Sequence, residues 1–227
     1  MTSNRSIQKK NAGYRAAEYV EDEMVLGLGT GSTAKFAIEK IGQRVKKERL
    51  CVKGIPTSIE TKKRAEEAGI ELTDLDEAHK IDLTIDGADE VDPNKDLIKG
   101  GGGALLREKV IASNSKKYIV IVDQSKIVDT LGESFDLPVE ILPHWVKATM
   151  GQVEALGCES KLRLVNNKPY KTDNGNHIID CDFGEIMEPK ELSKQLNMIP
   201  GVMENGLFLD MSDIVIIGKE KGFEERD

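Results

Sequence analysis

Four short segments of this chain combine glycines, hydroxyls, carboxylates and lysines in patterns that can bind and transform a polar ligand. The first, residues 27–33 (GLGTGST), follows an apolar run and leads into a helical pattern. Its glycines let a ligand approach the backbone, and amides at the start of a helix bind anions. The segment lacks the spacings of a P-loop and of a dinucleotide fingerprint. It indicates a site for a phosphate or a hydroxyl-rich ligand, with a hydroxyl-capped tight turn as the structural alternative.

The second segment carries two carboxylates. Asp86 and Asp89 are separated by Gly87 and Ala88 and come directly after an apolar run. Carboxylates at the end of a strand can hold sugar hydroxyls or move protons. An Asx-turn helix cap is the structural alternative, and a divalent-metal site is disfavoured because the EF-hand pattern is not met.

The third segment places Lys99 before four consecutive glycines, residues 100–103, and Glu108 in the helix that follows. Four consecutive glycines lose much conformational entropy when the chain folds. A loop whose backbone amides surround a ligand oxygen would explain why glycines occupy these positions. Glu108 is a candidate base in such a site. The structural alternative is a glutamate that stabilises the helix dipole and a solvated lysine.

The fourth segment, residues 123–126 (DQSK), also follows an apolar run and ends in Lys126. The structural alternative is that Lys126 is an ordinary surface lysine. All four polar segments are expected at the ends of parallel strands, where they would converge on one crevice.

The elements that position these segments alternate between strands and helices. Helices are expected at residues 5–20, 34–47, 57–69 and 104–113, and strands at residues 24–28, 51–55, 70–75, 81–85 and 118–122. The helix at 57–69 begins with the capping box Thr57 to Glu60 and ends at Gly69. This order predicts an α/β fold with a doubly wound, mostly parallel, Rossmann-like sheet.

Beyond residue 135 the pattern changes to that of a smaller α+β domain. Pro138 and Pro143 flank a strand at 139–142, and a helix is expected at 144–156. Two strands around the turn 172–176 (TDNGN), a helix at 189–197 and a strand after Pro200 follow. The apolar run at 213–218 can return to the main sheet. The predicted domains are therefore 1–135 plus 209–227, and an inserted 136–208 that can serve oligomerisation.

Composition narrows the function further. The net charge of −8 argues against a nucleic-acid footprint. Cys51, Cys158 and Cys181 are widely separated, which favours neither a disulfide framework nor a zinc site. Residues 1–20 lack the apolar core of a signal peptide, and no run approaches the roughly 20 apolar residues of a membrane span. The expected location is the cytoplasm, with no membrane partner.

Taken together, the four segments resemble the A-type ribose-5-phosphate isomerase family. The matching motifs are residues 29–33 (GTGST), 86–89 (DGAD), 99–102 (KGGG) with 107–109 (REK), and 123–126 (DQSK). The resemblance continues through residues 137–140 (LPVE), 172–176 (TDNGN) and 199–202 (IPGV), so it covers nearly the whole chain in order.

The resemblance implies interconversion of D-ribose 5-phosphate and D-ribulose 5-phosphate in the non-oxidative pentose phosphate pathway, without metal or cofactor. It implies that Glu108 moves a proton between C2 and C1 through an enediolate. Asp86 would assist ring opening, Asp89 would hold hydroxyls, and Lys99 with the glycine amides would stabilise the oxyanion. The implied substrate-binding residues are Thr30, Gly31, Ser32, Thr33, Asp86, Gly87, Ala88, Asp89, Lys99, Gly100, Gly101, Gly102 and Lys126.

The sequence is compatible with more than one assignment at several points. An amino-terminal lysine reaches the site in the family, and both Lys9 and Lys10 fit that position. The family resemblance implies a homodimer or a homotetramer without deciding between them. A coenzyme A transferase, with a glutamate nucleophile, is a rival enzyme class. A non-catalytic sugar-phosphate sensor is a third reading, disfavoured by the acidic chain and by the lack of a preceding helix-turn-helix pattern.

Overall fold

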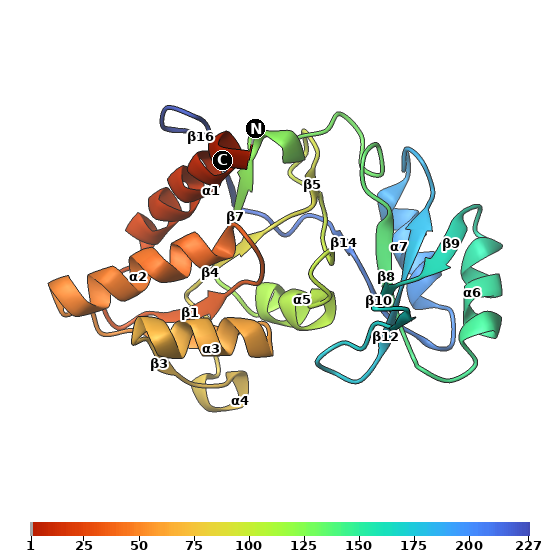
Figure 1. Cartoon of the computed structure of the whole chain (residues 1–227), viewed down its shortest axis with the longest axis horizontal. Coiled ribbons are helices and arrows are strands. Elements are labelled where there is room, and N and C mark those ends of the chain that lie inside the picture. The colour runs from red at the N-terminus through yellow and green to blue at the C-terminus, as the bar shows by residue number, and fades with distance from the viewer. Residues whose placement is uncertain (1) are drawn as a thin grey trace. The chain divides into compact units, whose positions relative to one another are not determined.

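Apolar strands alternating with amphipathic helices build the first of two compact units in the computed structural model, which describes residues 2–227 (Figure 1). The first unit contains the chain up to Ala88, together with Arg107–Lys126 and Met211–Asp227. The second unit contains Asp89–Leu106 and Ile127–Asp210. The segment Asp89–Leu106 thus groups with the second unit, although the sequence placed it in the larger domain. The predicted domain boundaries themselves stay a prediction.

The first unit is organised around a seven-stranded sheet with the order β16-β15-β7-β4-β1-β2-β3. All neighbouring strands are parallel except β15 and β16. The expected return of the last apolar run is confirmed, because β15 pairs with β7. The predicted fold class is confirmed as well. The strands are β1 (Val25–Leu28), β2 (Lys53–Pro56), β3 (Glu71–Leu72), β4 (Leu83–Gly87), β7 (Tyr118–Asp123), β15 (Ile214–Gly218) and β16 (Phe223–Arg226).

Helices cover both faces of this sheet because successive strand residues point to opposite sides. Leu83 and Ile85 of β4 pack into the core beneath α1 (Thr2–Ala16), α2 (Ala34–Glu48) and α3 (Ile59–Ala68). Between them, the Thr84 hydroxyl points the other way and hydrogen-bonds that of Ser115 at 2.6 Å. The face of the sheet to which Thr84 points is covered by α4 (Leu75–Ala78) and α5 (Leu105–Ser113). A short 3-10 helix, η1 (Ala17–Tyr19), follows α1.

The second unit has an antiparallel sheet with the order β13-β8-β12-β9, a small sheet with the order β14-β6-β5, and a two-stranded hairpin. Its helices are α6 (Val146–Glu154) and α7 (Pro189–Asn197). The strands are β5 (Glu90–Val91), β6 (Leu97–Ile98), β8 (Leu137–Ile141), β9 (Glu159–Leu162), β10 (Leu164–Val165), β11 (Lys168–Pro169), β12 (His177–Asp182), β13 (Val202–Asn205) and β14 (Leu207–Phe208).

Three local predictions need correction. Pro138 lies inside β8 rather than before it, and β13 pairs with β8 only from Val139 onwards, so the missing N–H costs no bond on that side. The strand expected at 70–75 shrinks to β3, because Asp74 caps α4. The cap of α3 is Ser58, not Thr57: the Ser58 hydroxyl accepts from the Thr61 amide.

An ion pair between α1 and the edge strand β16 offers a test of the first unit. Arg15 Nε donates to Glu225 Oε1 at 2.6 Å, and this hydrogen bond lowers the pKa of Glu225. The two side chains are 28% and 23% exposed. We expect Glu225→Gln to lower the free energy of unfolding by about 1 kcal/mol near neutral pH, measured by urea denaturation.

The difference between wild type and Glu225→Gln should depend on pH. A carboxyl with a lowered folded pKa adds stability above its unfolded pKa, and this stability is lost as pH falls through the folded pKa. The two proteins should therefore converge in acid, below about pH 4. Glu71→Gln, in a pair with Lys53 that is 64% and 54% exposed, serves as the control and should change little. A constant difference across this range would contradict the role of the ion pair.

Candidate functional site

Polar residues of the first unit gather where three neighbouring strands end. The loop at residues 29–33 follows β1, Asp86 lies near the end of β4, and Asp123 ends β7. These strands are adjacent in the order β7-β4-β1. The carboxyl ends of parallel strands form one edge, so three of the four predicted segments meet there.

Asp86 holds the centre of this edge. Its side chain is fully buried, and Oδ1 accepts hydrogen bonds from the Thr30 amide at 3.1 Å and from the Gly87 amide at 2.7 Å. A Cβ atom on Gly29 would fall onto the Asp86 carboxylate. Only glycine at position 29 therefore lets the loop after β1 pass this close to the carboxylate.

The Thr30 hydroxyl lies in a cluster of hydroxyls from the start of α3. Its Oγ1 is 2.6 Å from the Thr57 hydroxyl, 2.8 Å from that of Ser58 and 3.1 Å from that of Thr61. Sequence reasoning noted the cap but did not connect it with the loop at residues 29–33. The connection follows from the parallel pairing of β1 with β2, which brings the start of α3 beside that loop.

The structure distinguishes the two amino-terminal lysines. Lys9 Nζ donates to the Ser32 hydroxyl at 2.8 Å and lies 3.8 Å from the Asp123 carboxylate. Lys10 Nζ instead lies 5.0 Å from the centre of the Tyr14 ring on the same helix. Lys9 is thus the lysine that α1 brings to the edge formed by the carboxyl ends of β7, β4 and β1, called here the strand-end edge.

Two further predicted site residues of the first unit are Glu108 and Lys126. Glu108 lies in the first turn of α5 and is only 5% exposed. Lys126 ends the 3-10 helix η2 (Gln124–Lys126), directly after β7, and is half-buried.

The remaining predicted residues belong to the second unit. Lys99 follows β6, is 2% exposed, and its Nζ lies 5.4 Å from the centre of the Phe208 ring. The Gly101 amide donates to Asp89 Oδ2 at 2.7 Å. The expectation that this segment ends a parallel strand is wrong, because β6 is antiparallel to both β5 and β14. The run Leu97–Ile98 is too short to show its pairing partner in the sequence.

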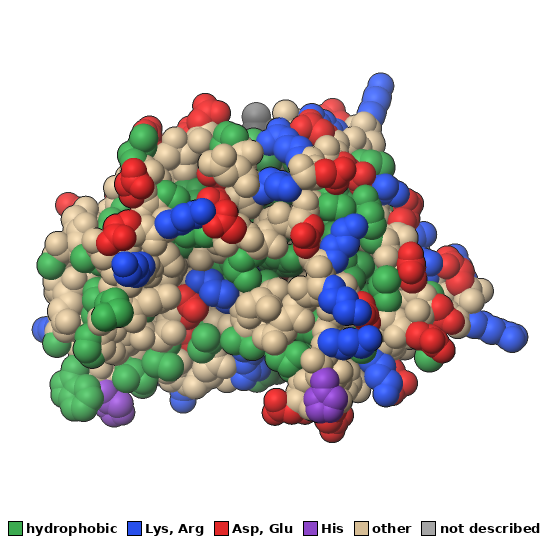
Figure 2. Space-filling view, turned by 180° about the vertical axis from the view of Figure 1, so that it is seen from behind, with side chains coloured by type: hydrophobic (Ala, Val, Ile, Leu, Met, Phe, Trp, Pro, Cys, Tyr) green, Lys and Arg blue, Asp and Glu red, His purple; other side chains and the backbone are tan. Residues whose placement is uncertain are grey.

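Within residues 2–227, no group of three or more His, Cys, Asp and Glu side chains is placed to hold a metal ion. On the face drawn in Figure 2, basic side chains are interspersed with acidic ones. None of the helices in this part of the chain has both the length and the hydropathy to cross a membrane.

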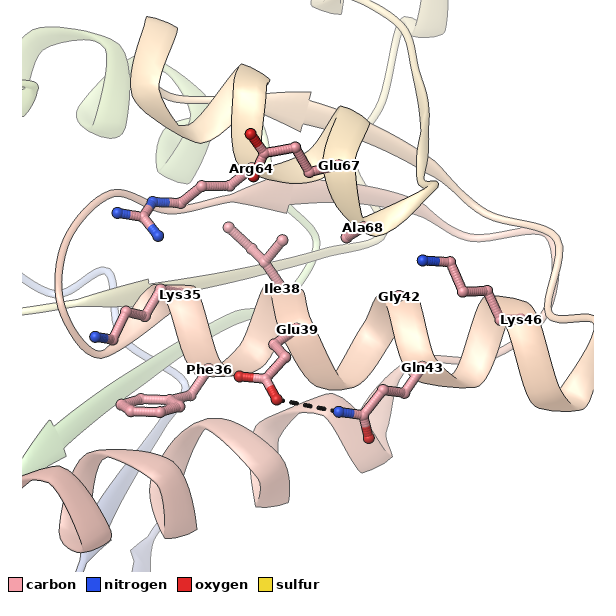
Figure 3. A pocket seen from close by; sticks show the side chains of 10 residues that line it. All are labelled: Lys35, Phe36, Ile38, Glu39, Gly42, Gln43, Lys46, Arg64, Glu67 and Ala68. Atoms are coloured by element: carbon pink, nitrogen blue, oxygen red, sulfur yellow. Dashed lines mark hydrogen bonds between the residues drawn. The ribbon is translucent and has the colours of Figure 1, made fainter.

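A hollow of about 450 Å³ lies between α2 and α3 (Figure 3). Lys35, Lys46 and Arg64 line it together with Glu39 and Glu67. Its charges are mixed, and none of the predicted site residues lines it. It is therefore separate from the strand-end edge.

A comparison with known proteins assigns the family. A family model described as ribose 5-phosphate isomerase A (phosphoriboisomerase A) matches residues 53–222. The chain belongs to this family. It is 50% identical over 212 residues to ribose-5-phosphate isomerase A 1 of Oceanobacillus iheyensis, covering 93% of this chain and 94% of the relative. It is 49% identical to the ribose-5-phosphate isomerase A of Bacillus mycoides, covering 96% and 98%.

Solved structures of the ribose 5-phosphate isomerase family agree in fold. The isomerase A from Methanocaldococcus jannaschii is 43% identical, with a TM-score of 0.93, covering 97% of this chain and 98% of that one. A D-ribose-5-phosphate isomerase in complex with phospho-erythronic acid is 42% identical, with a TM-score of 0.94, covering 97% of both chains. The resemblance found in the sequence is thereby confirmed.

The close approach of Gly29 to Asp86 yields a prediction. Gly29→Ala should lower the free energy of unfolding by about 1–3 kcal/mol, because the new methyl group overpacks a buried carboxylate. It should also lower isomerase kcat/KM on the order of 100-fold by displacing the loop. Thermal denaturation and a ribulose 5-phosphate assay measure the two effects.

The matched control for Gly29→Ala is Gly151→Ala in α6. A Cβ atom at Gly151 would have no neighbour within 4 Å, so alanine should raise helix stability by about 0.5–1 kcal/mol and leave activity unchanged. Equal behaviour of the two variants would refute the steric role of Gly29.

Proposed function

We propose that this protein interconverts D-ribose 5-phosphate and D-ribulose 5-phosphate as an aldose–ketose isomerase of the non-oxidative pentose phosphate pathway. The observation that carries the proposal is family membership supported along nearly the full length of the chain. A relative that binds phospho-erythronic acid, a four-carbon sugar-acid phosphate, supports a sugar-phosphate ligand.

In this proposal Glu108 is the base. It removes the proton from C2 of the open-chain aldose and returns it to C1, passing through an enediolate. Its burial supports the role, because a carboxylate shielded from water accepts a carbon-bound proton more readily. Leu105, three residues earlier on the same helix, is fully buried.

The other acidic and basic residues act on the sugar oxygens. Asp86 assists ring opening and the movement of protons between oxygens, and its two amide contacts hold it in place. Asp89 holds hydroxyls and, through the Gly101 amide, orients the glycine loop. Lys99 and the amides of residues 100–102 stabilise the negative oxygen of the enediolate.

The phosphate is assigned to the loop after β1. Residues 30–33 precede α2, a 15-residue helix whose amino-terminal amides favour an anion. Lys126 and Lys9 add positive charge, and Lys9 already contacts Ser32 of that loop. Local cations and amides are required because the whole chain carries a net charge of −8.

Glu108→Gln tests the mechanism. The amide keeps the shape of the side chain but cannot accept the proton, so kcat should fall by about 10²–10⁴-fold. The fold, followed by circular dichroism, and the affinity for phospho-erythronic acid, followed by calorimetry, should be retained. Glu67→Gln on α3 is the exposed control and should retain full turnover. Near-normal turnover in Glu108→Gln would reject Glu108 as the base.

We also propose that the chain forms a homodimer or homotetramer through the second unit and works in the cytoplasm. Three large apolar side chains of that unit are 73–80% exposed: Trp145, Met187 and Met198. For the proposed location, the free cysteines fit a reducing compartment such as the cytoplasm. Light scattering should give two or four times the 25.0 kDa of one chain, and Trp145→Glu should lower that mass. A monomeric wild type would contradict the assembly.

A further inference from the structure

The glycine loop of the second unit is a hydrogen-bonded turn. The Gly103 amide donates to the Gly100 carbonyl at 3.0 Å, so Gly101 and Gly102 are the two central residues. Positive φ angles occur at Gly100 and Gly103, the residues that flank this central pair. Type I and type II turns share the same hydrogen bond and differ in the orientation of the central peptide. In a type II turn the central peptide is flipped and Gly102 has a positive φ, which glycine allows at no steric cost. The sequence of the loop therefore does not select between the two orientations.

One side chain outside the loop selects the observed orientation. Arg163 Nη1 donates to the Gly100 carbonyl at 2.8 Å and to the Gly101 carbonyl at 3.2 Å. The amide in a trans peptide points away from its carbonyl, so both carbonyls face Arg163 while the Gly101 and Gly102 amides face away from it. The Gly101 amide then reaches Asp89 on the far side.

Arg163 is itself held in a fixed orientation. Its Nε donates to Asp180 Oδ2 at 2.9 Å, and Nη2 donates to Asp180 Oδ1, which makes a bidentate ion pair. Asp180 lies in β12, and the Arg163 amide bonds the carbonyl of Ile178 in the same strand. The guanidinium side chain is only 15% exposed. Strand β12 thus holds the cation that contacts the loop.

We propose that Arg163, oriented by Asp180, is a positioning residue that holds the Gly101–Gly102 peptide so that the Gly102 amide faces the reacting oxygen. This inference rests on the proposed function, in which the loop amides stabilise the enediolate. In this role Arg163 acts through the loop and not on the substrate itself. It acts by preventing the peptide flip that two neighbouring glycines would otherwise permit.

The test compares Arg163→Gln with wild type in steady-state isomerisation of ribose 5-phosphate. Misplacing an amide that acts on the transition state should lower kcat by about 10–100-fold, while KM changes less than about twofold. Arg163→Lys keeps the charge but not the forked geometry, so it should restore only part of kcat.

Arg44 provides a matched control. Its Nη1 donates to two backbone carbonyls, those of Ala17 and Val20, both at 2.7 Å, and its Nε pairs with Glu48. Arg44→Gln thus removes the same kinds of bonds far from the loop in sequence, and it should lower stability without changing kcat. A loss of kcat in Arg163→Gln no larger than in Arg44→Gln would overturn the inference.

Two further outcomes keep the experiment decisive. An inactive wild type would refute the proposed function itself, whereas an active wild type with a fully active Arg163→Gln would refute only the positioning role. If Arg163→Gln does not fold, Asp180→Asn decides, because it leaves the arginine in place but removes its bidentate partner. A fall in kcat at constant KM supports the proposal, and unchanged kcat rejects it.

Discussion

A carboxylate buried at the end of a strand must find hydrogen-bond donors inside the protein, because burying an unpaired charge is costly. Oδ1 of Asp86 accepts from two backbone amides, one of which belongs to the loop after β1. The loop can come close enough only because position 29 has no side chain. The path of this loop, the hydroxyl cluster around Thr30 and the start of α2 all depend on this contact.

A second buried carboxylate accepts hydrogen bonds from a loop in the antiparallel sheet of the second unit. Glu140 in β8 is fully buried, and its Oε1 accepts from the side chains of Thr172, Asn174 and Asn176 at 3.0, 3.1 and 2.9 Å. The motif TDNGN at 172–176 reads as a turn signal in the sequence. In the structure its polar side chains also line up on one carboxylate, so the turn is tied to a central strand. Buried acids therefore organise loops in both units.

The sequence predicted best what local chemistry determines. Apolar runs located β1 and β7, and the helix expected at 189–197 matches α7. The sequence did not predict features that depend on pairing between segments far apart in the chain. The two-residue strand β6 carries no periodicity, and nothing local shows that its partners are antiparallel. The contact of Thr30 with α3, and that of Arg163 with Gly100, join segments far apart in the chain, and one sequence does not reveal such neighbours.

The two ends of the chain run side by side in the first unit (Figure 1). Asn4 on α1 hydrogen-bonds Glu220 at 2.6 Å, and Asn11 bonds the Lys219 carbonyl at 2.8 Å, next to the ion pair of Arg15 with β16. The segment between β15 and β16 therefore anchors α1, the helix that brings Lys9 to Ser32 of the loop after β1.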